Sequence, residues 1–149
     1  MKAIHVLLIS IFITMSITSN AQNDKNRSEM GKVCRVYSGE GIYVTTCRIG
    51  PEKNNESLIL VNGLDHPWNE KIWKAKVLKN NENFDYQIQV DGKPFIIFTY
   101  RSNYYSYTVY LKDFGGEKNE QSVSYDKDES NACSPEIFLN QYLEQQSKK

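Results

Sequence analysis

The sequence contains only two histidines, three cysteines and three methionines among its 149 residues. This small supply of imidazole and thiol groups leaves little material for a metal cluster or a catalytic relay. An excess of charge of one sign is also absent, since 18 basic side chains balance 18 acidic ones. A neutral chain lacks the attraction that nucleic acids and anionic membranes offer basic proteins. We therefore expect no cofactor, no bound metal and no nucleic-acid partner.

No apolar run is long enough for a membrane-spanning helix, which needs about 20 residues. The main apolar stretch, residues 4–15, follows Lys2 and precedes the small-residue sequence Ser19-Asn20-Ala21. A basic start, a short apolar stretch and a small-residue end are typical of a secretory signal peptide. We predict that residues 1–21 are removed, which leaves 149 − 21 = 128 residues in a secreted or periplasmic protein without a membrane anchor.

The mature chain is predicted to consist of a short leader and one domain. Residues 22–30 (QNDKNRSEM) are almost entirely polar and are expected to form a disordered leader. Residues 31–149 are long enough to bury about two thirds of the surface that the unfolded chain exposes. A domain of this size forms one hydrophobic core, and disulfides only supplement it.

Aromatic residues are plentiful, with ten Tyr, six Phe and two Trp. From Gly31 onward, polar and apolar residues alternate between turn signals that recur every eight to twelve residues, a pattern typical of antiparallel β structure. We predict a mainly β fold, either an antiparallel meander sheet or a small barrel-like sheet of about eight strands. The expected strands are residues 32–38, 42–49, 57–62, 71–79, 84–90, 94–100, 104–111 and 121–125.

The strongest turn signal is Asp91-Gly92, which a two-residue type I′ hairpin favours because both central residues need a positive φ. That turn predicts the register of the two strands that flank it. Residues 95–98 are apolar on both faces, which predicts a central strand that a helix covers. The predicted cross-strand pairs are Ile88 with Phe95, Tyr86 with Ile97, and Phe84 with Thr99.

A helix is predicted at the C-terminal end of the chain. Ser134 is a good N-cap, Pro135 is compatible with the first helical position, and Glu136 suits the positive end of the helix dipole. A helix of about twelve residues is marginal by itself in water, so we expect it to pack on the sheet. Its apolar stripe consists of Phe138, Leu139, Tyr142 and Leu143.

Three cysteines in an exported protein allow one disulfide and one remaining thiol. If Glu40-Gly41 is a two-residue hairpin loop, Cys34 lies opposite Cys47 at a distance compatible with a disulfide. This hairpin pair is our prediction. The alternative joins Cys133 to one of the other two cysteines and attaches the start of the helix to the sheet.

The most distinctive loop is residues 62–70 (NGLDHPWNE). Asp65 beside His66 suggests an acid–base pair, and a small hydrolase would use both with Glu70. However, the sequence has no nucleophile motif and no second mature histidine for zinc. We therefore predict no catalytic residues and regard Asp65, His66 and Trp68 as candidate binding residues, while the structural alternative has Trp68 covering the end of the sheet.

Tyrosine is concentrated in residues 100–110, which contain five. In an extended strand, Tyr104 and Tyr110 share one face, while Tyr105 and Tyr107 lie on the more apolar face. Exposed tyrosines are common in protein-binding and sugar-binding surfaces, so Tyr104 and Tyr110 are further candidate binding residues. The alternative is that these tyrosines reflect β-propensity or are covered by the helix.

Carboxylates cluster in residues 126–129, but their spacing lacks the glycine of a calcium-binding loop. We predict a solvated loop there and no metal site.

A signal peptide followed by a small β domain without a catalytic constellation is a format shared by small periplasmic inhibitors and immunity proteins. We therefore predict a non-enzymatic binding protein that acts by occluding the surface of a protein partner outside the cytoplasm. The alternatives are a carbohydrate-binding module that uses exposed tyrosines and a small hydrolase that uses Asp65 and His66.

Overall fold

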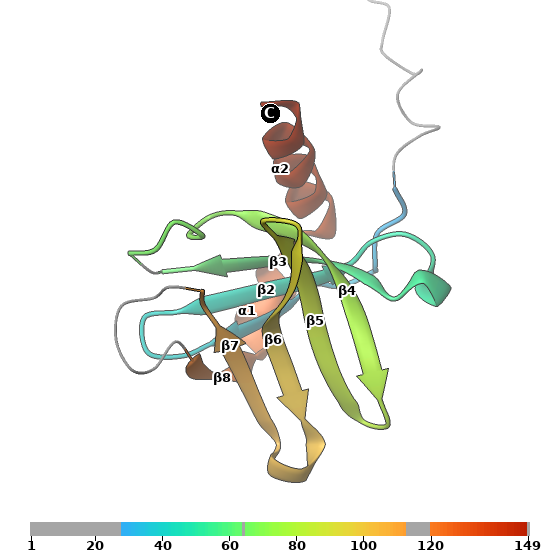
Figure 1. Cartoon of the computed structure of the whole chain (residues 1–149). Coiled ribbons are helices and arrows are strands. Elements are labelled where there is room, and N and C mark those ends of the chain that lie inside the picture. The colour runs from blue at the N-terminus through green and yellow to red at the C-terminus, as the bar shows by residue number, and fades with distance from the viewer. Residues whose placement is uncertain (1–27, 64, 113–119, 149) are drawn as a thin grey trace, which may run out of the picture.

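The computed structural model describes residues 28–63, 65–112 and 120–148 (Figure 1). The predicted signal peptide and leader residues 22–27 lie outside the described residues. Eight antiparallel strands form a closed barrel in which every strand pairs with its sequence neighbours and β8 pairs with β1. The strands are β1 (Arg35–Ser38), β2 (Tyr43–Arg48), β3 (Glu56–Asn62), β4 (Ile72–Asn80), β5 (Asn83–Val90), β6 (Lys93–Arg101), β7 (Ser106–Tyr110) and β8 (Glu120–Asp126).

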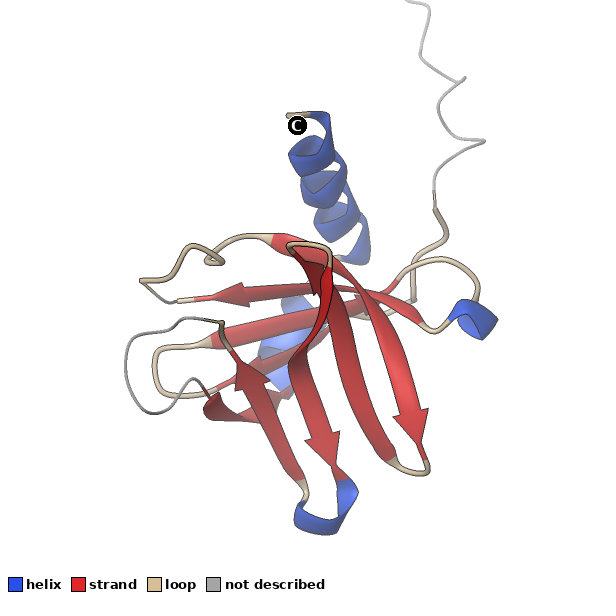
Figure 2. Cartoon of the chain, viewed as in Figure 1, coloured by secondary structure: helices blue, strands red, loops and turns tan. Residues whose placement is uncertain are grey.

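The prediction of a mainly β, barrel-like fold of about eight strands with a C-terminal helix is confirmed (Figure 2). The observed strand ends lie within one residue of the predicted ends, except at the starts of β1 and β7. The alternation of polar and apolar side chains therefore locates the strands well, because each strand has one face in the core.

The first ordered contacts lie inside the segment predicted to be a disordered leader. Met30 forms a β-bridge with Ile49, and Glu29 is 2.8 Å from Arg48 in an ion pair. Met30 also packs against buried apolar side chains on the outside of the barrel. The single apolar residue of the leader thus finds a hydrophobic site that a composition argument does not reveal.

The β5–β6 hairpin follows the prediction at its turn and departs from it further on. Asp91 and Gly92 both have positive φ, 52° and 73°, and Ile88 pairs with Phe95 as predicted. A β-bulge then shifts the register between Tyr86 and Gln87, so the two pairs predicted beyond it are wrong. The observed pairs are Tyr86 with Phe98 and Phe84 with Tyr100.

The bulge explains the apolar run at residues 95–98. The extra residue in β6 allows Ile97 and Phe98, although adjacent in sequence, to enter the same core, and both are essentially inaccessible to solvent. The expectation that a helix covers the second face of this strand is therefore wrong.

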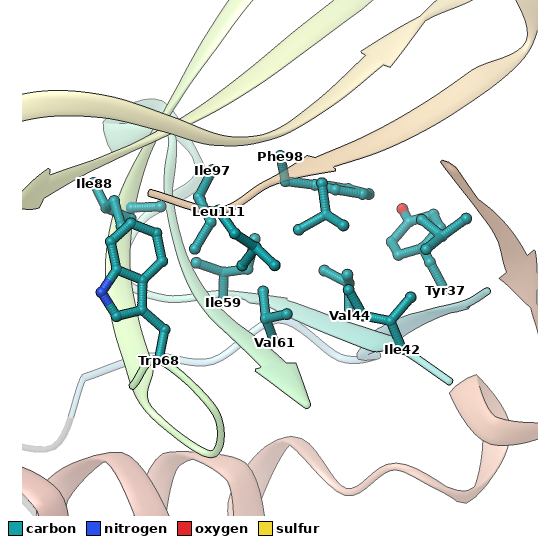
Figure 3. Close-up of a cluster of buried hydrophobic side chains, with 13 residues drawn as sticks. Tyr37, Ile42, Val44, Ile59, Val61, Trp68, Ile88, Ile97, Phe98 and Leu111 are labelled. Atoms are coloured by element: carbon teal, nitrogen blue, oxygen red, sulfur yellow. The ribbon is translucent and has the colours of Figure 1, made fainter. Parts of the chain in front are cut away.

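The inner core fills the barrel between its walls, and Figure 3 shows Trp68 at one end of this row of side chains. It combines aliphatic and aromatic residues from all eight strands and from three connecting segments. The buried members are Tyr37, Ile42, Val44, Ile59, Val61, Trp68, Ala75, Ile88, Ile97, Phe98, Val109, Leu111 and Val123.

The helix α2 (Pro135–Ser147) begins as predicted, since the Ser134 hydroxyl accepts a hydrogen bond from the Ile137 amide. It packs on the outside of the barrel against β4 and its neighbours, where Phe138 and Leu139 are buried. We call this second core the outer cluster. Its buried members are Cys34, Cys47, Ile49, Leu58, Ile72, Phe138 and Leu139.

A short helix, α1 (Lys127–Ala132), replaces the solvated loop predicted at residues 126–129. The Asp126 carboxylate accepts a hydrogen bond from the Glu129 amide at 3.1 Å and caps this helix. The buried Ser130 hydroxyl accepts a hydrogen bond from the Val36 amide at 2.8 Å. The helix therefore satisfies the backbone of β1, a contact across 94 residues that local sequence does not reveal.

The meander topology gives the barrel two distinct ends (Figure 1). The β1–β2, β3–β4 and β5–β6 connections lie at one end, which we call the closed end. The β2–β3, β4–β5 and β6–β7 connections lie at the other end, which we call the mouth. Two of these contain single-turn helices, η2 (Glu52–Asn54) between β2 and β3 and η3 (Ser102–Tyr104) between β6 and β7.

Candidate functional site

Trp68 belongs to the closed end and is only 8% exposed. Its ring makes edge-on contacts with Trp73 at 5.4 Å and Phe95 at 5.3 Å between centroids. The Asn69 side chain holds the loop by accepting a hydrogen bond from the Gly63 amide at 2.9 Å. These contacts favour the structural role of Trp68, because a buried ring offers little surface to a partner.

Both nitrogens of the His66 ring have hydrogen-bond partners. Nδ1 accepts from the Trp68 amide at 3.1 Å, and Nε2 lies 2.8 Å from the Lys112 carbonyl oxygen. Since a carbonyl only accepts, Nε2 carries the hydrogen and the ring is held as the neutral tautomer. A base at this position would first have to break one of these bonds.

The other acidic residues of the loop do not support a catalytic arrangement. Asp65 is exposed, and in the described part of the chain no hydrogen bond or ion pair connects Asp65 or Glu70 to His66. Glu70 has a φ of 60°, which places it in the left-handed region as part of the return to β4. The structure therefore places these residues in one loop without assembling them into an acid–base pair.

The predicted register of the first hairpin is confirmed, because Arg35 pairs with Thr46 and the same register places Cys34 opposite Cys47. Both cysteines are buried in the outer cluster, and the partly buried Cys133 packs against it. None of the three is bridged in this structure. The disulfide stays a prediction.

Interaction with the Cys47 thiol and burial raise the pKa of Cys34, and the Cys133 thiol acts in the same direction. The interaction with Cys34 lowers the pKa of Cys47. Cys34 therefore interacts with both other thiols. A Cys34–Cys47 or a Cys34–Cys133 disulfide would use it, and a Cys47–Cys133 disulfide would leave it as the remaining thiol.

Tyr104 and Tyr105 lie at the mouth and are the most exposed large apolar side chains, at 80% and 84%. The prediction that residues 104–105 belong to a strand is wrong, because the chain turns through η3 before β7 begins at Ser106. Tyr105 adopts a left-handed conformation with a φ of 48°. Tyr105 was therefore wrongly assigned to the apolar face of a strand. Tyr110, the other predicted binding tyrosine, lies in β7 and is only partly exposed.

A cavity of about 380 Å³ opens at the mouth, and we call it the mouth pocket. The residues before β1 and the ends of β2, β3, β4 and β5 line it. Its lining includes Lys32, Arg35, Thr46, Val77, Lys79 and Tyr86. None of these residues was predicted as a site, because they are far apart in sequence and each occupies an ordinary strand position.

The wall beside the mouth pocket is rich in tyrosine. The rings of Tyr37 and Tyr107 lie 4.6 Å apart, and those of Tyr100 and Tyr107 stack at 4.7 Å. Burial raises the pKa of Tyr37 and Tyr86, while the Arg35 guanidinium partly opposes this effect at both phenols. Arg35 therefore lies close enough to both phenols to affect their ionisation.

Among the described residues, no group of three or more His, Cys, Asp or Glu side chains could hold a metal ion. None of the helices in the described ranges is long and apolar enough to cross a membrane. Comparisons with protein-family models, with curated proteins and with solved structures found no match to this chain.

Proposed function

We propose that the protein is a non-enzymatic binding protein that acts outside the cytoplasm by occluding the surface of a protein partner. The observation that carries this proposal is the adjacent pair Tyr104 and Tyr105, which project from the mouth at 80% and 84% exposure. Large aromatic side chains are costly to expose in water, and tyrosine is prominent among the residues that dominate binding energy at protein interfaces.

The backbone at Tyr105 supports the same role. A left-handed conformation is uncommon for a residue with a bulky side chain and costs about 1 kcal/mol or more. Asn or Gly would occupy this turn with less strain. A tyrosine in this strained conformation supports a use of its side chain, because none of the described residues buries it.

The loop at the closed end gives the enzyme hypotheses little support. His66 has both nitrogens engaged and Asp65 makes no hydrogen bond to it. Trp68 serves the inner core. We therefore place the recognition surface at the mouth.

The location outside the cytoplasm rests on the N-terminal sequence. A basic residue, a short apolar stretch and the small-residue end at Ala21 support cleavage there. Mass spectrometry of the protein secreted or exported by its source cells should find a chain that starts at Gln22. Recovery of the intact chain from the cytoplasm would contradict this part of the proposal.

We call the exposed pair Tyr104 and Tyr105 the tip. Binding can be tested with tip variants that leave the barrel intact. Tyr104→Ser removes an aromatic anchor, and Tyr105→Asn removes the other while relaxing the left-handed backbone. Tyr43→Ser is the matched control, because Tyr43 is a half-exposed tyrosine on β2. Each immobilised protein is exposed to the envelope and extracellular fractions of the source cells, and the retained proteins are quantified.

The proposal expects a protein that the wild type and Tyr43→Ser retain and that both tip variants lose. The purified candidate should then bind in solution, with an affinity at least about 30-fold weaker for Tyr104→Ser, equivalent to about 2 kcal/mol. Equal retention by all four proteins would contradict the proposal. Loss of oligosaccharide binding by the tip variants, without any protein partner, would favour the carbohydrate-binding alternative.

A further inference from the structure

The mouth pocket collects positive charge that the protein does not neutralise. Arg48 is paired with Glu29, but no carboxylate pairs with Lys32, Arg35 or Lys79 among the described residues. All three line the same cavity of about 380 Å³. This arrangement leaves three cationic groups directed to one concave site.

Negative charge in the lining compensates only in part. Glu56 is already 2.9 Å from Lys74, which leaves Glu52 on the single turn between β2 and β3 as the remaining acidic lining residue. Three unpaired cations against one carboxylate give the pocket a net positive potential. A concave site with such a potential attracts anions and repels cations.

The pocket also offers flat apolar surface and hydroxyl groups. Phe84, Tyr86 and Val77 contribute the apolar part of the lining. The Thr46 hydroxyl and the Arg35 guanidinium both lie close enough to Tyr86 to lower the pKa of its phenol, although burial raises it more. Cationic groups at the rim and aromatic rings further in would suit a ligand that has both a charged end and a flat body.

We propose that the mouth pocket binds a small organic anion with a flat apolar body. The Arg35 guanidinium would hold a carboxylate or phosphate through two parallel hydrogen bonds, a geometry that matches both groups. Lys79 and Lys32 would add charge, while Phe84 and Tyr86 would contact the body of the ligand. The cavity volume lies within the range of small-molecule sites.

This site is separate from the proposed protein-binding tip. Tyr104 and Tyr105 do not line the mouth pocket, and the pocket would exist whether or not a partner binds them. Failure of either proposal therefore leaves the other intact.

The probes are benzoate, phenyl phosphate and the neutral benzamide, each added to the ¹⁵N-labelled mature protein and followed by NMR. We expect saturable shifts for the two anions at the amides of Arg35, Thr46, Val77 and Lys79, and at least tenfold weaker binding of benzamide. Binding should also weaken as salt rises, because part of the attraction is electrostatic. Comparing benzoate with phenyl phosphate distinguishes a carboxylate site from a phosphate site.

Two pairs of variants assign the effect to residues. Lys79→Met removes a cation that lines the pocket, and Lys76→Met, on the same strand but outside the lining, is its matched control. Arg35→Met should weaken anion binding at least tenfold, and Arg35→Lys should weaken it less because the charge remains. Lys79→Met should weaken it about threefold and Lys76→Met not at all.

The proposal is overturned if no anion produces saturable shifts at the mouth, or if benzamide binds as well as benzoate. It is also overturned if Lys76→Met weakens binding as much as Lys79→Met, because binding would then follow overall charge. The lysine pair keeps this test decisive even if Arg35→Met proves unstable.

Discussion

At the closed end of the barrel, Trp68 lies among other aromatic rings, and the loop around it is held by backbone amides that donate hydrogen bonds to the Asn69 and His66 side chains. At the mouth, Arg35 and Lys79 surround a cavity and have no carboxylate partner in the described chain. The same eight strands build both ends. At the closed end the His66 and Asn69 side chains form hydrogen bonds within the protein, whereas the mouth leaves charge and aromatic surface exposed.

This contrast shows that a loop of unusual composition need not be a binding or catalytic site. The loop at residues 62–70 has the more unusual composition, yet its histidine and tryptophan serve the fold. The mouth pocket is lined by residues that look ordinary along each strand and form a cavity only when the barrel closes. An unusual local sequence therefore does not by itself mark the place where charge and a cavity come together.

The largest effect is expected at the closed end. Trp68→Ala should lower the free energy of unfolding by about 3 to 5 kcal/mol, as for other buried aromatic residues. Urea denaturation measures this loss, and NMR shows whether the mouth is preserved. A loss below about 1 kcal/mol would mean that the closed end is not a core, which would break the comparison.

The outer cluster provides a matched pair on α2. Leu139 is 2% exposed and Leu143 is 45% exposed, so Leu139→Ala should cost about 2 to 5 kcal/mol and Leu143→Ala less than about 1 kcal/mol. The same denaturation measurement compares them. Equal costs would show that α2 does not pack on the barrel through the face described.

The disulfide is the next test. If Cys34 and Cys47 are bridged in the exported protein, the closed hairpin loop should add about 3 kcal/mol to stability, and reduction should remove it. Peptide mapping without reductant should find this link, and Cys133→Ser should retain it. A linked peptide that contains Cys133 would instead show that the start of α2 is attached to the sheet.

A smaller effect is expected at alkaline pH on the mouth side. Burial raises the pKa of Tyr37, so the unfolded chain loses this proton first as pH rises above about 10. The contribution of Tyr37 to the free energy of unfolding is therefore fully present below that pH. Above it, the free energy of unfolding falls by up to about 1.4 kcal/mol per pH unit for one such group. Tyr37→Phe should reduce the slope of the free energy of unfolding against pH, measured by urea denaturation at several pH values above about 10.

The smallest effect is expected at Arg35. This exposed side chain has no carboxylate partner in the described chain, so Arg35→Met should change the free energy of unfolding by less than about 0.5 kcal/mol. Thermal or urea unfolding gives the value. A loss of 2 kcal/mol or more would mean that Arg35 serves the fold, and the contrast between the two ends would weaken.

Much of the fold could be predicted because its determinants are local. Alternating side chains located the strands, Asp91-Gly92 specified a hairpin turn, and Ser134 marked the start of α2. Each of these signals depends on residues a few positions apart, whose backbone preferences persist in any context. The pairing of the first hairpin followed for the same reason.

The remaining features depend on contacts between distant segments. Closure of β8 on β1 brings Ser130 to the backbone of Val36, and a bulge lets Ile97 and Phe98 share the inner core. Burial of Trp68 and the convergence of charge around the mouth pocket likewise require the complete barrel. Local residue patterns therefore specify which segments become strands and turns, whereas the burial or exposure of each side chain depends on neighbours that only closure of the barrel supplies.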